Sequence, residues 1–390
     1  MKYAEKLQEG IYWVGAIDKD VRNFHGYRTE KGTTYNAYLL IGEKVALVDT
    51  VKADFAEEML ERIRSVIEPE KIDFIVSNHA EPDHSGALPR IAALAPRAEI
   101  LTAAGAGKKT LSLYYGALPY REVRTGDTLD LGTFTLSFVQ TPMVHWPDNM
   151  VSYCKERKIL FSNDAFGQHF AFEKLRDAEN DADEIAWQAK KYYANIVNPY
   201  TPQVKKALEA LGGLEIGTIA PSHGVIWTQP ETALALYRAF VGERKEKAVV
   251  VYDSMWHSTE RMAETIAEAF RAAGKQTVLC DLKKRHNSDV LTDLQDAKYL
   301  AVGSPCLNSG MMPTVASFLS YLKGLRYDPK QAFCFGSYGW SPAYLSEMEK
   351  CLAEMKDPIL LPAVKAQFLP DERACEEIAK NLSDALANAG

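Results

Sequence analysis

Cysteine is scarce in this chain of 390 residues, and its six cysteines are scattered without any C-x-x-C pair. Closely spaced cysteines hold iron–sulfur and rubredoxin-type centres, and regularly spaced cysteines form the disulfide frameworks of small secreted domains. We therefore expect neither a cysteine-ligated metal centre nor a disulfide framework. A reducing, cytoplasmic environment fits this cysteine usage best.

Long apolar runs and an excess of basic residues are also missing. No run approaches the ~20 apolar residues that cross a bilayer, and the N-terminal residues MKYAEKLQEG contain no apolar signal segment. The formal net charge of -7 argues against nucleic-acid binding, which needs a basic face. With 47% hydrophobic and 25% charged residues, the composition is that of an ordinary soluble protein, and the length predicts about two domains.

The most informative stretch that is present is SNHAEPDHSGALPR, residues 77–90. Four metal-competent side chains fall within six residues: His79, Glu81, Asp83 and His84. They follow the apolar run 72–76, which predicts a buried strand. Pro82 predicts that the stretch itself is not helical, and residues 86–89 begin a new element. So many ligating groups at one strand end favour a metal site over an ordinary polar loop.

Three more ligating side chains follow apolar strands further along the chain: His145, Asp164 and His223. Strand ends on one edge of a sheet converge in space, which is where α/β folds place their sites. The sequence therefore predicts one shared metal site with four imidazoles and three carboxylates available to it.

The first 245 residues predict alternating strands and helices. We expect strands up to about residue 45, then over 45–49, 72–76, 99–102 and 216–220, a strand pair around 129–139, and a hairpin of 150–154 with 159–162. Helices are expected over 54–66, 107–115, 183–196 and 203–211. The charged run Gly242–Lys247 is typical of a linker, so we place a domain boundary near residue 245.

The number and type of ligands narrow the choice of metal. Seven protein ligands suit two ions, with one carboxylate bridging them. Zinc hydrolases with such strand-end sites carry H-x-H-x-D-H, whereas here Glu81 takes the place of the second histidine. A hard, charged carboxylate favours iron or manganese and suits activation of dioxygen or a similar small molecule. Zinc also accepts carboxylate oxygen and stays an alternative.

From residue 246 onwards, strand–loop–helix units predict a doubly wound parallel sheet. Three loops after its strands carry hydroxyl, amide and aromatic groups. The first opens a helix whose N-terminus can hold a phosphate without arginine, and Tyr338 and Trp340 can flank a flat ring. With no G-x-G-x-x-G in the first loop, flavin mononucleotide (FMN) is favoured over a dinucleotide. The expected FMN-binding residues are Ser254, Met255, Trp256, His257, Ser258, Thr259, Ser304, Pro305, Cys306, Leu307, Asn308, Ser337, Tyr338, Gly339 and Trp340.

Together the two halves resemble the flavodiiron proteins (A-type flavoproteins), which include rubredoxin:oxygen oxidoreductases and nitric oxide reductases. The segments that match this family are 79–84, 143–149, 163–169, 191–195, 221–224, 253–259, 303–305 and 338–340. The resemblance implies a metallo-β-lactamase-like αββα sandwich over 1–245 and a flavodoxin-like FMN domain over 246–390. One departure from simple flavodoxins is His257, which stands where they have a glycine.

Carried over residue by residue, the resemblance assigns two iron ions. The first would take His79, Glu81 and His145, the second Asp83, His84 and His223, and Asp164 would bridge them. His25 and Tyr193 would lie near the pocket as catalytic groups. The family implies reduction of dioxygen or nitric oxide, electrons from rubredoxin or a reduced deazaflavin, and a head-to-tail homodimer or dimer of dimers.

Two other interpretations stay open. One is a binuclear zinc hydrolase with an attached flavodoxin-like domain, which metal analysis would distinguish. The other is a non-catalytic electron-transfer flavoprotein with a vestigial metal site. Gas consumption that survives substitution of His79 or Asp164 would favour the latter.

Overall fold

The computed structural model describes residues 2–356 and 358–388 and divides the chain into two compact units. The first comprises the chain up to Tyr192 together with Tyr200–Val241, and the second comprises Tyr193–Pro199 together with the chain from Gly242. Residues 193–199, which the sequence analysis assigns to the first domain, thus belong with the second unit. No helix among the described residues is long and apolar enough to cross a bilayer.

The first unit is built on two large sheets and two small ribbons. The seven-stranded sheet runs in the order β1 (Glu5–Gln8), β2 (Ile11–Trp13), β7 (Tyr38–Ile41), β8 (Val45–Val48), β9 (Phe74–Ser77), β10 (Glu99–Ala103) and β11 (Tyr120–Val123). The five-stranded sheet runs in the order β12 (Thr128–Asp130), β13 (Thr135–Gln140), β14 (Met150–Cys154), β15 (Ile159–Asn163) and β16 (Thr218–Pro221). The ribbons pair β3 (Ala16–Asp18) with β6 (Thr33–Tyr35), and β4 (Asn23–Phe24) with β5 (Tyr27–Arg28).

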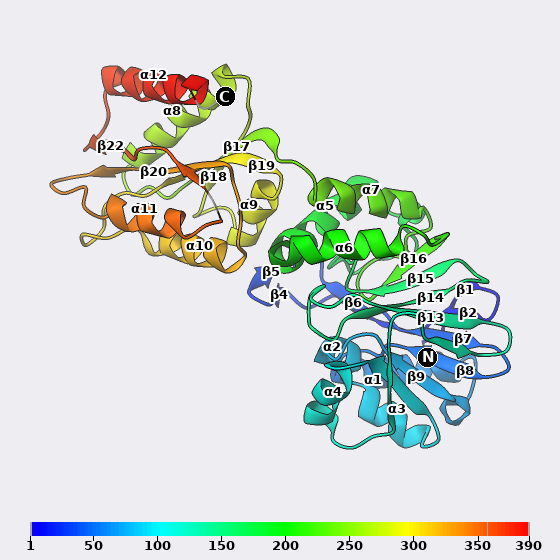
Figure 1. Ribbon diagram of the computed structural model, residues 1–390. Helices are drawn as coiled ribbons and strands as arrows, with labels where there is room; N and C mark the ends of the chain where they lie inside the picture. The colour runs from blue at the N-terminus through cyan, green and yellow to red at the C-terminus, as the bar shows by residue number, and fades with distance from the viewer. Residues whose placement is uncertain (1, 357, 389–390) are drawn as a thin grey trace. The chain divides into compact units, whose positions relative to one another are not determined.

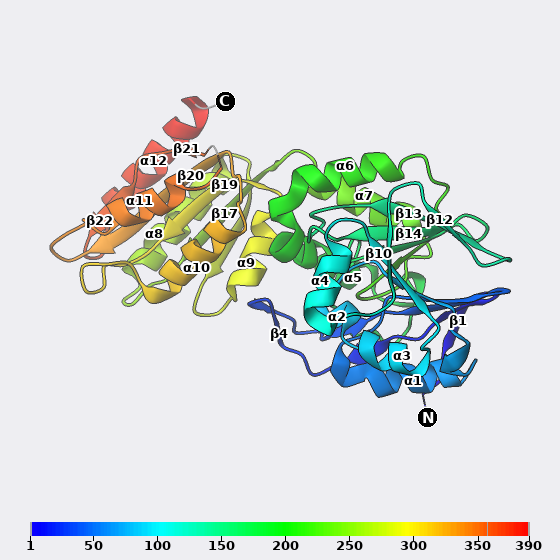
Figure 2. The same cartoon turned by 60° about the horizontal axis from the view of Figure 1, so that its bottom comes forward.

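Helices lie on the outer sides of these sheets (Figures 1 and 2). The first sheet is covered by α1 (Ala56–Arg64), α3 (Leu88–Leu94) and α4 (Gly107–Tyr115), whose apolar side chains share one core with β7–β10. Beside the second sheet lie α5 (Ala182–Tyr192), α6 (Thr201–Leu211) and α7 (Pro230–Phe240). Between the sheets, the rings of Tyr38 on β7 and Phe161 on β15 lie 5.1 Å apart. The expected αββα sandwich is confirmed.

The second unit is a parallel sheet with helices on both faces. Its strands run in the order β18 (Gln276–Asp281), β17 (Lys245–Tyr252), β19 (Ala297–Gly303) and β20 (Gln331–Tyr338), and β20 also pairs with β21 (Ile359–Leu360) and β22 (Val364–Gln367). All these pairings are parallel. One face packs against α8 (Ser258–Ala272) and α12 (Glu372–Asn388), and the other against α9 (Asn287–Leu294), α10 (Pro313–Gly324) and α11 (Leu345–Ala353). The doubly wound sheet predicted from the sequence is confirmed.

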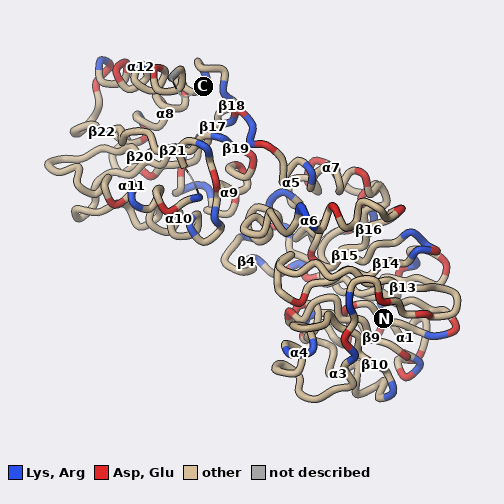
Figure 3. Tube along the Cα trace, in the orientation of Figure 1, with Lys and Arg blue, Asp and Glu red and all other residues tan. Residues whose placement is uncertain are grey.

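Charged residues of both signs are interspersed along the trace of each unit, while the middle of the parallel sheet is almost free of them (Figure 3). The central strands β17 and β19 are covered on both faces, and Val249–Val251 and Leu300–Val302 are fully buried. Such strands form near-continuous apolar runs because neither face meets water. Within these two strands the charged side chains therefore lie at the amino-terminal ends, at Lys245, Glu246, Lys247 and Lys298.

Two local predictions were wrong. Residues Pro82–Ser85 form a short helix, α2, although Pro82 predicted a non-helical stretch. Proline stands at its first turn, where the backbone N–H would lack an intrahelical partner anyway, so the missing N–H costs nothing. The run Gly242–Lys247 is not a linker throughout, because β17 already begins at Lys245 and Lys247 pairs in register with Gln276.

Candidate metal centre and cofactor cleft

Four strand ends of the first unit bring the seven predicted ligands together. His79 to His84 follow β9, His145 follows β13, Asp164 follows β15 and His223 follows β16. All seven side chains are buried, with at most 9% of any residue exposed. They form two groups, His79–Glu81–His145–Asp164 and Asp83–His84–His223, and within each group the ligand atoms lie within 4.8 Å of one another. The convergence expected from strand-end placement is therefore present in the structure.

Asp164 lies between the two groups and turns one oxygen toward each. Its Oδ2 is 3.6 Å from His79 Nε2 and 3.4 Å from His145 Nε2. Its Oδ1 is 2.9 Å from His84 Nε2 and 3.7 Å from His223 Nε2. A carboxylate with one oxygen facing each of two ligand clusters has the geometry required to bridge two metal ions.

A second carboxylate completes each group. Glu81 Oε2 lies 3.2 Å from His79 Nε2 and 3.3 Å from His145 Nε2. In the other group Asp83 presents Oδ1 to His84 Nε2 at 3.3 Å and Oδ2 to His223 Nε2 at 3.2 Å. Each group thus offers imidazole nitrogen and carboxylate oxygen to a common point, the mixed donor set that iron accepts.

Several of these atoms have no oriented hydrogen bond within the described part of the chain. They are both oxygens of Asp83, both oxygens of Asp164 and both ring nitrogens of His84. Burying polar atoms without partners is costly, and native structures satisfy nearly all of them. Two cations held between the groups would satisfy these oxygens and the Nε2 atom, so the residues present fit a dinuclear metal site.

Further contacts fix the orientation of the imidazoles. Asp148 Oδ2 lies 3.2 Å from His79 Nδ1 and accepts a hydrogen bond from the Ala80 N–H at 2.6 Å. The Thr34 carbonyl oxygen lies 2.6 Å from His223 Nδ1 and accepts its proton. With Nδ1 acting as donor, Nε2 of both rings keeps its lone pair for a metal ion.

The loop that carries His223 is held firmly by the β6–β7 segment. The Asn36 side-chain amide donates to the carbonyls of Pro221 and Gly224, and the Gly224 N–H donates to Thr34 Oγ1. Gly224 has φ +76°, and a Cβ there would lie 2.0 Å from Gln168 Oε1. Only glycine fits this position, which explains the residue after His223.

Some residues of the site were not among the sequence predictions. Asp49, at the end of β8, accepts hydrogen bonds from the Asn78 N–H, the Asn78 amide and the Asn163 amide. Asp148 and His169 also belong to the surroundings of the cluster, and His169 stacks on His223 with ring centroids 4.6 Å apart. The presence of Asp49 and Asp148 near the site could have been predicted, because one follows an apolar strand and the other lies three residues after His145, but their hydrogen-bond partners could not. For His169 the sequence gives no such signal.

The two predicted catalytic groups lie in different settings. His25 and Gly26 form the two-residue turn of the β4–β5 hairpin with φ values of 51° and 83°, as in a type I′ turn. His25 Nε2 lies 2.9 Å from Glu81 Oε1, and its side chain is 46% exposed. Tyr193 is fully buried and opens a π-helical turn, Tyr193–Val197, assigned to the second unit. Its neighbour Tyr192 packs on His223, with ring centroids 5.9 Å apart, and Tyr35 lies 6.1 Å from the same ring.

Burial and charge together set the protonation of the cluster. Burial alone lowers the pKa of His84 and of His145, but nearby carboxylates outweigh it and raise both pKa values to about 9. Burial likewise opposes ionisation of Asp164, yet the surrounding imidazoles hold its pKa well below the usual value. Desolvation raises the pKa of Asp49 to about 6. Without metal, His84 and His145 therefore carry protons opposite the ionised Asp164.

The second unit carries a cleft at the carboxyl ends of its strands. The cleft has a volume of ≈ 490 Å³, within the usual range for small-molecule sites. Eleven of the fifteen predicted FMN residues line it: Ser254, Met255, Trp256, Ser258, Pro305, Cys306, Asn308, Ser337, Tyr338, Gly339 and Trp340. Ser309, Ser341 and Phe368 line it as well, and His257, Thr259, Ser304 and Leu307 are not among the lining residues.

The cleft suits a flat ring joined to a phosphate. Trp256 and Trp340 are 82% and 92% exposed and stand free to cover an aromatic ligand. Ser254 Oγ is buried in the cleft wall without a hydrogen-bond partner in the described residues. Ser258 begins α8, whose N-terminus favours an anion. The residues present therefore fit FMN.

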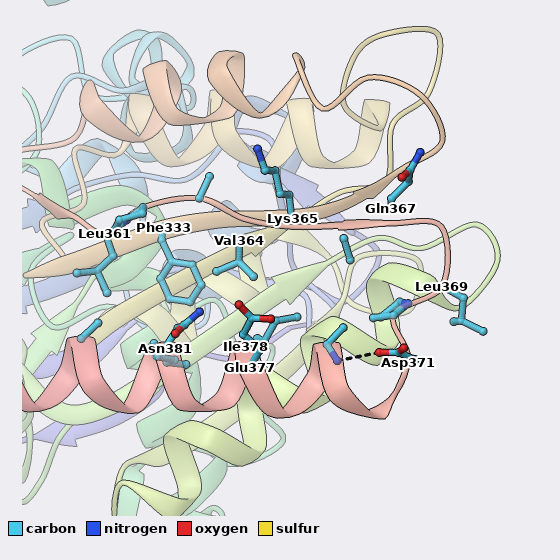
Figure 4. Close-up of a pocket in the computed structure, with 17 residues that line it drawn as sticks. Phe333, Leu361, Val364, Lys365, Gln367, Leu369, Asp371, Glu377, Ile378 and Asn381 are labelled. Atoms are coloured by element: carbon cyan, nitrogen blue, oxygen red, sulfur yellow. Dashed lines mark hydrogen bonds between the residues drawn. The ribbon is translucent and has the colours of Figure 1, made fainter.

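A different cavity of the second unit lies between α12 and the strands β20–β22 (Figure 4). Its volume is ≈ 720 Å³, and apolar side chains such as Phe333, Val364 and Ile378 line it. The charged side chains among its lining residues are Lys365, Asp371 and Glu377. A largely apolar cavity with two carboxylates against one ammonium does not suit a dianionic phosphate, so the strand-end cleft is the better flavin site.

Known proteins resemble the chain over nearly its full length. The family described as "ODP family beta lactamase" matches residues 33–224, and the family described as "Flavodoxin" matches residues 250–381. The rubredoxin-oxygen oxidoreductase of Megalodesulfovibrio gigas is 40% identical over 99% of this chain and 98% of that protein. The nitric oxide reductase of Moorella thermoacetica is 39% identical over 98% of both chains.

Solved structures agree with these sequence matches. The rubredoxin oxygen:oxidoreductase from Desulfovibrio gigas superposes with a TM-score of 0.94 at 40% identity, covering 99% of both chains. The flavodiiron protein from Giardia intestinalis gives a TM-score of 0.94 at 34% identity, covering 98% of this chain and 96% of that one. Both units, in their order along the chain, are therefore shared with these proteins.

Proposed function

The chain belongs to the flavodiiron protein family, and we propose that it reduces dioxygen or nitric oxide at two iron ions that receive electrons from FMN. The observation that carries this proposal is the placement of Asp164, whose two oxygens face two separate groups of buried histidine and carboxylate ligands. A mononuclear site would not need this arrangement.

Glu81 favours iron over zinc in this centre. Its carboxylate stands between His79 and His145, where zinc hydrolases of this kind use a histidine. A charged oxygen ligand stabilises an oxidised ion and so suits redox chemistry. Two irons and FMN, when bound, supply the electrons: four, with four protons, convert dioxygen to two waters, and two, with two protons, convert two nitric oxides to nitrous oxide and water.

The residues of the chain would position the metals, keep the site dry and supply protons. Asp164 would set the spacing of the two metals, and Asp148 and the Thr34 carbonyl would hold the rings of His79 and His223. Buried walls would exclude bulk water. His25 is the proposed proton donor, because its Nε2 contacts Glu81 while its side chain is partly open to solvent. We place Tyr193 with it as a second candidate on the strength of the family resemblance alone.

Electron donors and assembly belong to the same proposal. Relatives are named rubredoxin-oxygen oxidoreductase and coenzyme F420H(2) oxidase, so we propose rubredoxin or a reduced deazaflavin as donor. Trp256 and Trp340 line the flavin cleft and are largely exposed, so a donor can approach the cleft from solvent. By the family resemblance we also propose a head-to-tail homodimer, in which the flavin of one subunit serves the irons of the other.

One experiment tests the function as a whole. Protein expressed with ample iron and riboflavin is assayed for iron and FMN per chain, then reduced anaerobically and mixed with nitric oxide or dioxygen under the same donor. We expect about two irons and one FMN per chain and consumption of at least one gas. Two zincs without gas consumption would support the hydrolase instead. Consumption that survives His79→Ala and Asp164→Ala would support an electron-transfer flavoprotein with a vestigial site.

A further inference from the structure

Lys283, just after β18, reaches the first loop of the flavin cleft. Its Nζ donates a hydrogen bond to the Ser254 carbonyl oxygen at 2.6 Å and lies 4.0 Å from Asp253 Oδ1. Ser254 lines the cleft. Backbone N–H groups and the N-terminus of α8 can hold a phosphate at this loop without arginine, and Lys283 adds a positive charge beside them.

The loop contains a negative charge that opposes a phosphate. Asp253 directly precedes Ser254 and is 1% exposed. Thr314 Oγ1 donates to its Oδ2, but Oδ1 accepts no hydrogen bond within the described residues. An ionised carboxylate directly before Ser254 would repel a dianion held at this loop. The ammonium of Lys283 is positioned to offset this repulsion.

Glu260, another acidic residue near the loop, has hydrogen-bond partners for both of its oxygens. Glu260, in the first turn of α8, lies 2.5 Å from His257 Nδ1 through Oε2 and accepts from the Tyr252 hydroxyl through Oε1 at 3.2 Å. Neither Glu260 nor His257 is among the residues that line the cleft. Asp253 does not line the cleft either, but its Oδ1 accepts no hydrogen bond within the described residues and lies 4.0 Å from Lys283 Nζ, so Asp253 is the carboxylate that Lys283 can offset.

Lys283 also fixes the peptide that presents an unpartnered hydroxyl to the ligand. Ser254 is 4% exposed, and its Oγ has no hydrogen-bond partner within the described part of the chain. Because Nζ holds the carbonyl of the same residue, the hydroxyl is kept at the cleft wall. A hydroxyl held in this way can donate to a phosphate oxygen.

From these contacts we propose that Lys283 makes the cleft selective for phosphorylated over unphosphorylated flavin. It does so by compensating Asp253 and by positioning the Ser254 peptide. This inference rests on the proposed FMN site and adds the residue that sets its preference for the phosphate. Lys283 is a positioning residue here, not a ligand of the isoalloxazine ring.

The test compares FMN with riboflavin, which lacks only the phosphate. Flavin-free full-length protein is titrated with each, and quenching of flavin fluorescence gives the two Kd values. Lys283→Met and Lys283→Gln are expected to weaken FMN binding about tenfold, or about 1.4 kcal/mol, and riboflavin binding less than twofold. Lys284→Met is the matched control: its Nζ pairs with Asp281 at 3.4 Å, it is 76% exposed, and neither Kd should change.

A double variant tests the charge argument. In an Asp253→Asn background there is no carboxylate to offset, so adding Lys283→Met should weaken FMN binding by less than about threefold. An equal loss of FMN and riboflavin affinity in the single variants would overturn phosphate selectivity, as would no loss of either. If the wild-type protein failed to bind FMN, the proposed function would fall together with this inference. If it bound FMN with a riboflavin-to-FMN ratio insensitive to Lys283, only this inference would fall.

Discussion

His79 Nδ1 and Asp148 Oδ2 lie 3.2 Å apart in the buried wall of the metal site, and the Ala80 N–H donates to the same oxygen at 2.6 Å. The carboxylate holds the proton on Nδ1 and leaves Nε2 free to bind a metal ion. Burial lowers the pKa of His79, but Asp148 together with Glu81 and Asp164 outweighs burial and raises that pKa well above its ordinary value.

Asp148→Asn should therefore weaken iron binding. An amide oxygen at the position of Oδ2 still accepts from Ala80 and faces His79 Nδ1, but it lacks the negative charge that holds the proton on Nδ1, so the tautomer with a free Nε2 is favoured less. Losses of this kind are typically about 10–100-fold in metal affinity. Iron per chain and iron retention against a chelator measure the effect, with FMN content as internal reference. The exposed Asp54→Asn is the control, and equal iron retention in both variants would contradict the role of Asp148.

Metal loading should release protons and depend on pH. In the metal-free protein the pKa values of His84 and His145 are about 9, so both rings carry a proton at pH 7. A metal ion binds only the unprotonated Nε2. Apparent affinity should thus rise from pH 6 to 9 and be lost in acid, and loading redox-inert zinc at pH 7 should release at least about one proton per ion. A pH indicator detects this release, and pH-independent affinity would contradict the prediction.

Protonation of His84 and His145 makes the folding stability of the metal-free protein change with pH in the opposite direction. The folded pKa of each imidazole lies above its unfolded value, so the stabilisation that the bound proton provides is complete below pH ~6.5. It is lost as the pH rises through about 9. Thermal melts of metal-free protein should therefore show falling stability over the range in which metal affinity rises.

His257→Gly should stabilise the second unit. His257 precedes α8 with φ 63°, a left-handed conformation that glycine adopts freely and that costs other residues about 1 kcal/mol. Loss of the exposed contact with Glu260 offsets this gain by at most a few tenths of that amount. We expect a rise in Tm of about 1–3 °C with FMN binding retained.

The control for this variant is His286→Gly. His286 also precedes a helix, but its φ is -70° and its side chain accepts a hydrogen bond from the Ser288 N–H. Glycine there removes a helix cap without relieving strain, so Tm should fall. A lower Tm for His257→Gly would show that the Glu260 contact outweighs the backbone strain.

The convergence of the seven candidate metal ligands could be predicted from the sequence because each follows an apolar strand, and such strand ends meet at one edge of a sheet. Individual hydrogen bonds between residues far apart in the sequence could not be predicted. Asp148 lies 69 positions from His79, and Lys283 lies 29 positions from Ser254, so no local pattern links either pair. Pro82 misled the helix prediction because the rule that proline disrupts helices does not apply to their first turn.

The left-handed backbone conformation of two histidines could not be predicted from the sequence either. His25 and His257 adopt positive φ, and although histidine does so more often than most residues, it indicates this conformation far less strongly than glycine does. At His25 the turn is imposed by the pairing of β4 with β5, and Gly26 is the only one of its two central residues that signals it. The resulting contact of His25 with Glu81 is a tertiary effect.

His25→Asn should slow gas reduction while leaving both cofactors bound. Asn–Gly is the favoured pair for a type I′ turn, so the β4–β5 hairpin should persist, but the shorter side chain cannot maintain the 2.9 Å contact with Glu81 Oε1. A misplaced proton donor typically costs about 10²-fold or more in rate. Single-turnover mixing of reduced protein with each gas measures this rate, together with iron and FMN content.

His257→Asn, an exchange at another exposed left-handed histidine, is the control and should leave the rate unchanged. Loss of iron in His25→Asn would make His25 a structural support of Glu81, and an unchanged rate would remove it from the proposed proton path.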